Sequence, residues 1–114
     1  MIEVKFSFSD DGKTIVLSSS GHADAAPRGE DTVCAAASIL VYTVAQEITD
    51  LRAEGKLRRK PTVRLDPGSA VLTCKPTKGA YAEALHTFKV AQTGYRLLAA
   101  NFPDHVRVHT FGEA

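Results

Sequence analysis

The sequence predicts an α+β fold, a sandwich of two helices packed on a mixed or antiparallel sheet, with the element order β-β-α-β-β-α-β. Three observations predict this fold: an N-terminus of alternating polar and apolar residues, two long stretches with helical periodicity, and turn residues between the remaining short apolar runs. The chain has 114 residues, of which 44% are hydrophobic and 24% charged. This length and composition suit a single globular domain spanning residues 1–114.

The strands are predicted from period-two alternation and from the turns beside them. Ile2, Val4, Phe6 and Phe8 recur at every second position, which is typical of a half-buried strand. A turn at residues 10–13 leads to a second strand at 14–20. Further strands are expected at 62–65 and 70–75, around the turn Asp66-Pro67-Gly68-Ser69, and a last short strand at 106–110.

Two helices are predicted, at about 32–57 and about 80–101. Asp31 stands where the N-cap of the first helix belongs, while Gly55 and Pro61 mark its end. Pro103 ends the second helix. The apolar positions of the first helix are Val33, Ala37, Leu40, Val41, Val44, Ile48 and Leu51. Those of the second are Tyr81, Leu85, Phe88, Tyr95 and Leu98.

The charge balance argues against a dedicated nucleic-acid site. Fourteen Lys and Arg face thirteen Asp and Glu, which gives a formal charge of +1, whereas nucleic-acid binders carry a large basic surplus. The basic run 56–60 is a local exception with two interpretations. It is either a solvated helix end or a patch that contacts RNA.

The cysteine content and the N-terminus bear on the compartment. Residues 1–9 contain no long apolar core, so we expect neither a signal peptide nor a membrane span there. The expected location is the cytoplasm, where a disulfide between Cys34 and Cys74 is not expected. Cys74 falls in a predicted strand, so we expect it to be a packed thiol.

The residues best suited to chemistry are Cys34 and His22. With Asp31 as the N-cap, Cys34 is the third residue of a helix, where the positive end of the dipole favours a thiolate. The free N–H groups of the first turn are candidate donors to a substrate oxyanion. His22 precedes Cys34 by 12 residues (34 − 22), at the end of a strand, and could act as its base. From spacing alone, a small buried cysteine and a surface histidine remain the alternative.

Two neighbours could support this pair. Ser38 lies one helical turn beyond Cys34 and either forms a hydrogen bond near the site or bonds back to a helix carbonyl. Asp31 either caps the helix or orients His22, and the cap requires no further assumption. No metal or other cofactor is expected, because the sequence lacks the paired spacing of zinc ligands.

The stretch from 21 to 38 resembles the signature of a known family. Gly-His-Ala, five residues, then Gly-x-Asp-x-Val-Cys-Ala-Ala-x-Ser is similar to the motif of the ribosomal-processing cysteine protease family, Prp. The resemblance implies a cysteine endopeptidase with Cys34 as nucleophile and His22 as base. It also implies a mobile loop at 24–30, with Gly21 and Gly29 as its hinges.

The same resemblance implies the partners. The substrate would be a precursor ribosomal protein of the large subunit, from which an N-terminal extension is removed during ribosome assembly. The protease would be a homodimer. Two alternatives remain at this point: a phage or prophage maturation protease of the same chemistry, and a non-enzymatic module that binds RNA or the ribosome through residues 56–60.

Overall fold

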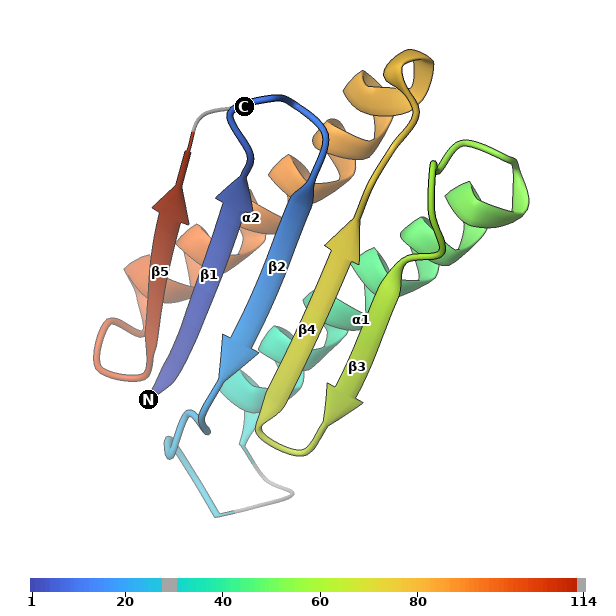
Figure 1. Cartoon of the computed structure of the whole chain (residues 1–114). Helices are drawn as coiled ribbons and strands as arrows, with labels where there is room; N and C mark the ends of the chain where they lie inside the picture. Colours follow the sequence, from blue (N-terminus) through green and yellow to red (C-terminus); the bar gives the residue numbers. More distant parts are fainter. Residues whose placement is uncertain (28–30, 113–114) are drawn as a thin grey trace.

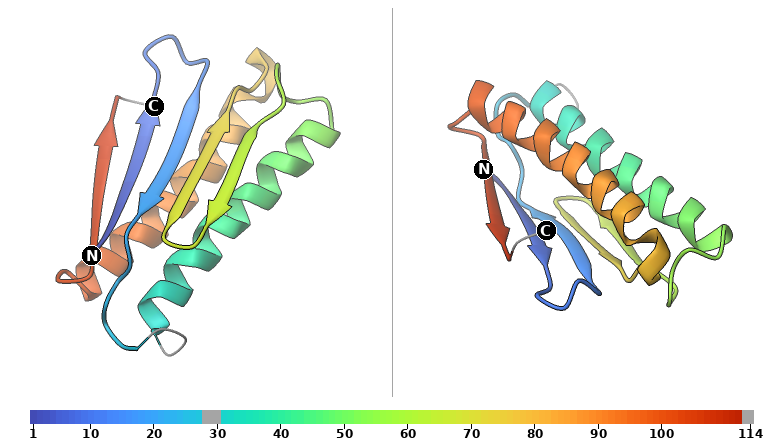
Figure 2. Two further views of the ribbon diagram at one scale, coloured as in Figure 1. Left: turned by 60° about the horizontal axis from the view of Figure 1, so that its bottom comes forward. Right: turned by 90° about the horizontal axis from the view of Figure 1, so that it is seen from above.

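The chain folds as one five-stranded mixed sheet with two helices on one of its faces (Figures 1 and 2). The computed structural model describes residues 1–27 and 31–112. The elements are β1 (Ile2–Phe8), β2 (Ile15–Ser20), α1 (Thr32–Ala53), β3 (Thr62–Asp66), β4 (Ser69–Cys74), a 3₁₀ turn (Lys78–Ala80), α2 (Tyr81–Asn101) and β5 (Val106–Phe111). The predicted α+β class and element order are confirmed.

The order of the strands across the sheet is β3-β4-β2-β1-β5. All neighbours are antiparallel except β1 and β5, which are parallel. This topology gathers several segments at one end of the sheet, at the bottom of Figure 1. The end of β2, the β3–β4 turn, the start of β5 and the first turn of α1 all lie there. Segments from four parts of the sequence therefore surround one site.

The core lies between the sheet and the helices. The alternating residues of β1, from Ile2 to Phe8, are buried as predicted. The rings of Phe6 and Tyr95 meet edge to face, with their centroids 6.0 Å apart. The Tyr95 hydroxyl donates to the Ala37 carbonyl oxygen at 2.7 Å and so joins the two helices. Burial raises the pKa of Tyr95.

The helix faces agree with the expected ones at most positions. Val33, Val41, Ile48 and Phe88 are among the predicted residues that are buried, whereas four are half-buried: Leu40, Tyr81, Leu85 and Leu98. Several residues that complete the core were not predicted: Ala45, Ala84, Ala91 and Gln92. Three of these four residues are alanines. By length and composition α1 could cross a membrane, but here its buried stripe packs into the core.

The first helix ends earlier than predicted. It stops at Ala53, followed by Glu54 as C-cap and by Gly55 with φ +74°, whereas the sequence suggested residue 57. The reason is that Leu57 is buried and forms a bridge with Pro76, so the chain must leave the helix before it. The last strand is one residue longer than expected and ends at Phe111.

The basic run 56–60 therefore follows the helix instead of ending it. Lys56 lies 3.3 Å from a Glu54 carboxylate oxygen and 2.9 Å from one of Glu83. Arg58 donates to the carbonyl oxygens of Lys13 and Pro76, at 2.8 and 3.1 Å. These two cations tie surface segments together. Lys56 and Arg58 already have partners within the chain, so only the other basic residues of the run could form the RNA-binding patch considered above.

Candidate active site

The start of α1 is closed by Asp31, and this cap fixes the position of Cys34. One carboxylate oxygen, Oδ1, accepts the backbone N–H groups of Val33 and Cys34, each at 3.0 Å. The Cys34 N–H makes the largest contribution to holding the pKa of the Asp31 carboxyl below its usual value. The predicted N-cap is confirmed, and Cys34 is the third residue of the helix.

The same cap uses the hydrogen-bond donors that were expected to hold a substrate oxyanion. The Val33 and Cys34 N–H groups donate to the Asp31 carboxylate, and the Ala35 N–H donates to the Asp31 carbonyl oxygen at 3.1 Å. For these three groups the expectation of free donors is wrong. The side chain and the carbonyl group of Asp31 together engage these three N–H groups.

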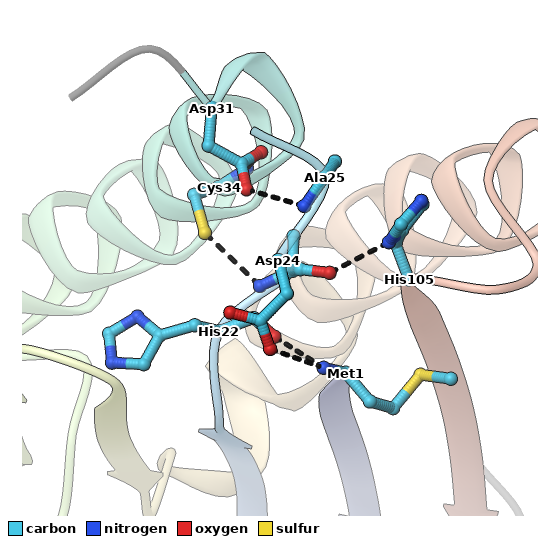
Figure 3. Close-up of polar contacts among 8 residues, drawn as sticks. Met1, His22, Asp24, Ala25, Asp31, Cys34 and His105 are labelled. Carbon is cyan, nitrogen blue, oxygen red and sulfur yellow. Dashed lines mark hydrogen bonds and ion pairs between the residues drawn. The ribbon is translucent and has the colours of Figure 1, made fainter. Parts of the chain in front are cut away.

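The sulfur of Cys34 faces the segment that follows β2. The residue is half-buried, and its Sγ accepts the Ala23 backbone N–H at 3.2 Å (Figure 3). Ala23 is only 1% exposed. A backbone N–H directed at sulfur favours the anionic form of a thiol. The thiol therefore meets a donor from the loop side of the site.

His22 reaches the same cavity from the end of β2. Gly21, with φ +93°, donates its N–H to the Gly68 carbonyl oxygen at 2.9 Å and turns the chain there. The imidazole lies against the β3–β4 turn, since a Cβ on Gly68 would lie 2.7 Å from its Nε2. Among the residues that the structure describes, no hydrogen bond joins this imidazole to Cys34 or Asp31. The predicted pair shares a cavity but is not joined.

The cavity has a volume of about 510 Å³, within the range of small-molecule and peptide-side-chain pockets. One wall is the face of α1 that carries Cys34 and Ser38, and the opposite wall is the β3–β4 turn. Tyr42 and Leu65 give it an apolar part. Its acidic lining comes from three carboxylates, those of Asp24, Asp31 and Asp66. The side chains of Cys34 and His22 both line this cavity.

Two contacts that the sequence did not suggest anchor the segment after His22. The Nδ1 of His105 donates to the Ala23 carbonyl oxygen at 2.7 Å, and the Ala25 N–H donates to Oδ2 of Asp31 at 3.0 Å (Figure 3). The histidines at 86, 105 and 109 have no ligand-like spacing, so nothing local marked His105. His105 comes close to Ala23 because β5, which begins directly after His105, pairs with β1.

The remaining site residues are placed as follows. Gly21 has no room for a side chain, because a Cβ there would lie 2.2 Å from the Met1 carbonyl oxygen. Ser38 lines the cavity, and its hydroxyl makes no hydrogen bond within residues 1–27 and 31–112. Gly29 and part of the 24–30 loop lie outside the described residues. The hinge roles of the two glycines remain predictions.

Cys74 differs from Cys34 in its surroundings. It lies at the end of β4 and is fully buried. Burial raises the pKa of its thiol to about 11. The expectation of a packed thiol is confirmed, and Cys74 is unsuited to nucleophilic attack near neutral pH.

Fold and site together define an α+β protein with a thiol and an imidazole on one cavity, the arrangement used by thiol-dependent hydrolases. The sequence profile of a family described as cysteine protease Prp matches residues 1–107. The chain therefore belongs to the Prp family of cysteine proteases. No curated protein sequence matches it significantly.

Solved structures share the fold. The ribosomal processing protease Prp of Staphylococcus aureus, in complex with a covalently linked product peptide, superposes with a TM-score of 0.74 at 22% identity. The match covers 96% of this chain and 99% of that one. The same protease with a substrate peptide gives a TM-score of 0.69 at 21% identity, over the same shares of the two chains. A protein of Streptococcus mutans gives 0.65 at 20% identity, over 99% of this chain and 96% of its own.

Proposed function

We propose that this chain is a cytoplasmic endopeptidase that removes the N-terminal extension of a large-subunit ribosomal protein during ribosome assembly, and that it acts as a homodimer. Membership of the Prp family supports the proteolytic activity. The S. aureus protein of similar fold is described as a ribosomal processing protease, which supports the substrate class. The observation that carries the proposal is the shared cavity of Cys34 and His22 at the start of α1.

The proposed reaction is acyl transfer through a thioester. The Cys34 thiolate attacks the scissile carbonyl carbon, a C–S bond forms, and the His22 imidazolium gives its proton to the leaving amine as the C–N bond breaks. Water then attacks the thioester, with His22 as base, and the C–S bond breaks to release the acid. The imidazole rests against Gly68 and is exposed, so this mechanism requires the His22 side chain to rotate from the turn toward the sulfur.

The test is incubation with the host's precursor ribosomal protein, followed by mass spectrometry of the products. We expect one N-terminal cut by the wild type and none by Cys34→Ala, which lacks the nucleophile. His22→Ala should cleave roughly a hundredfold more slowly or worse, as is typical when a general base is removed. Cys74→Ala is the matched control, because it removes the other thiol, and it should cleave like the wild type.

Two results would contradict the proposal. Full cleavage by Cys34→Ala would remove the thiol from the mechanism. An intact precursor with folded wild-type protein, verified by circular dichroism, would mean that the substrate class is wrong.

A further inference from the structure

The peptide groups on both sides of Ala23 are engaged in hydrogen bonds. The Ala23 N–H donates to Cys34 Sγ at 3.2 Å, and its carbonyl oxygen accepts from His105 Nδ1 at 2.7 Å. A carbonyl oxygen only accepts, so Nδ1 carries a hydrogen in this contact. Ala23 thus links the imidazole of His105 to the sulfur of Cys34 through its own backbone.

His105 is itself held firmly at the end of the sheet. Its carbonyl oxygen accepts the Ile2 N–H at 2.8 Å, and its own N–H donates to the Phe102 carbonyl oxygen at 2.9 Å. The next residue, Val106, begins β5 and is buried. The side chain that holds Ala23 therefore projects from a rigid part of the fold and not from the loop.

The Ala23 N–H matters because the alternative donors are engaged. The N–H groups of Val33 and Cys34 donate to the Asp31 carboxylate. Within the part of the chain that the structure describes, the Ala23 N–H is the hydrogen-bond donor on the Cys34 sulfur. A thiolate at this position would depend on it for stabilisation.

We propose that His105 is a positioning residue for the nucleophile. Its Nδ1–H holds the carbonyl group of Ala23 and so fixes the backbone at this residue. The N–H of Ala23 therefore stays on the Cys34 sulfur and stabilises the thiolate. His105 does not touch the reacting atoms and acts through Ala23. The hydrogen bond also holds the backbone directly after His22, the residue that carries the proposed base. The relevance to catalysis rests on the proposed function above, whereas the effect on the thiol does not.

The test compares His105→Ala, His105→Asn and His109→Ala. The Asn amide can place an N–H close to the position of Nδ1. His109 is on β5, the strand that follows His105, and its Nε2 pairs with a Glu3 carboxylate oxygen at 2.7 Å. Its replacement removes a nearby imidazole that makes no contact with Ala23. The readout is the rate of Cys34 alkylation by iodoacetamide against pH, with the labelled site identified by peptide mass spectrometry.

We expect His105→Ala to be alkylated about tenfold more slowly at neutral pH, with its rate curve moved to higher pH, because a thiolate hydrogen bond is lost. His105→Asn should recover most of the rate, and His109→Ala should match the wild type. In precursor cleavage, His105→Ala should lower kcat and leave KM nearly unchanged.

An unchanged or faster alkylation in His105→Ala, with the fold intact by circular dichroism, would overturn the proposal. So would an equal loss in His105→Asn and His109→Ala, because it would show a general effect of altering the chain around the start of β5. Alkylation requires no substrate, so this result is independent of whether the wild type cleaves the precursor.

Discussion

At the residue scale, the site contains an acidic side chain close to a thiol that is proposed to act as an anion. Two negative charges side by side would destabilise one another. The Asp31 carboxylate accepts three backbone N–H groups, from Ala25, Val33 and Cys34, so its charge is well compensated. The sulfur receives a separate donor from Ala23. The Asp31 carboxylate and the Cys34 sulfur thus accept hydrogen bonds from different backbone N–H groups.

The hydrogen bonds to the Asp31 carboxylate predict that the stability of the folded protein depends on pH in the acid range. The pKa of Asp31 is lowered in the folded state, so its contribution is present above its unfolded value and is lost as the pH falls through the lowered one. Asp31→Ala should lower the midpoint of thermal unfolding at pH 7 by roughly 4–8 °C. Asp31→Asn keeps one acceptor oxygen and should lose less.

Thermal unfolding followed by circular dichroism at pH 7 and below about pH 4 measures this effect. The difference between the wild type and Asp31→Ala should shrink at the lower pH. Asp104→Asn, which removes an exposed carboxylate from outside the helix start, is the control. A difference that stays constant across the range would show that the Asp31 charge is not what stabilises the cap.

Local sequence was sufficient for the residues whose role is set by their neighbours. Asp31 and Cys34 are three positions apart, so cap and thiol can be read from one helical turn. The contact of His105 with Ala23 joins residues 82 positions apart, and no local pattern signals it. The proposed oxyanion donors failed for a related reason: the sequence identified the cap, but not how many N–H groups its carboxylate would accept.

At the scale of elements, the β3–β4 turn forms the wall against which His22 rests. Pro67 and Gly68 make the turn, and Gly68 has φ +71°. A side chain at Gly68 would meet His22 Nε2 at 2.7 Å. A glycine at this position therefore allows the left-handed backbone conformation of the turn, and it also leaves the space that the imidazole occupies.

Gly68→Ala should therefore disturb catalysis as well as stability. The added methyl group takes the space in which the His22 imidazole rests, so the ring of the proposed base starts from another position and cleavage should change. Gly55→Ala is the matched control, since Gly55 has φ +74° and a Cβ added there would have no atom within 4 Å. Both variants carry a left-handed alanine, which costs about 1 kcal/mol.

Precursor cleavage and thermal unfolding together distinguish the two effects. Similar losses of stability, with a change in cleavage confined to Gly68→Ala, would support an influence of the turn on His22. Equal cleavage by the two variants would show that the turn does not influence the base.

Element types and order followed from periodicity, because apolar alternation and helical spacing extend over many residues. Boundaries were less certain where long-range contacts intervene. The first helix ends at Ala53 because Leu57 pairs with Pro76, on a segment nearly twenty residues further along the chain. The small residues at the helix–sheet and helix–helix contacts, such as Ala84 and Ala91, were missed because alanine carries little periodic signal.

At the scale of the whole molecule, the two thiols differ in their access to solvent, because the helices cover one face of the sheet. Cys34 lies at the end of the sheet where the cavity opens, whereas Cys74 lies at the far end of β4 and is fully buried. Iodoacetamide at pH 7.5 should label Cys34 and leave Cys74 unmodified until the protein unfolds. Burial raises the pKa of the Cys74 thiol to about 11, so its thiolate is scarce at this pH as long as the protein stays folded.

Peptide mass spectrometry with and without denaturing urea measures this selectivity. Both cysteines should react at similar rates in urea, which is the internal control. Preferential labelling of Cys74 in the folded protein would contradict the assignment of the nucleophile.

The arrangement of the strands could not be predicted from the sequence. Hairpins were expected between neighbours, but the parallel pairing of β1 with β5 joins the two ends of the chain. Many pairings satisfy the same alternation, and only the complete packing of the two layers selects one.

This pairing has a consequence for when the site matures. The proposed nucleophile and base are both synthesised within the first third of the chain, but the strand that delivers His105 comes last. During synthesis, Cys34 and His22 are therefore present in the nascent chain before His105, which holds the Ala23 backbone. On the proposed function, full reactivity of the thiol would arrive only when β5 has paired with β1 and His105 has reached Ala23.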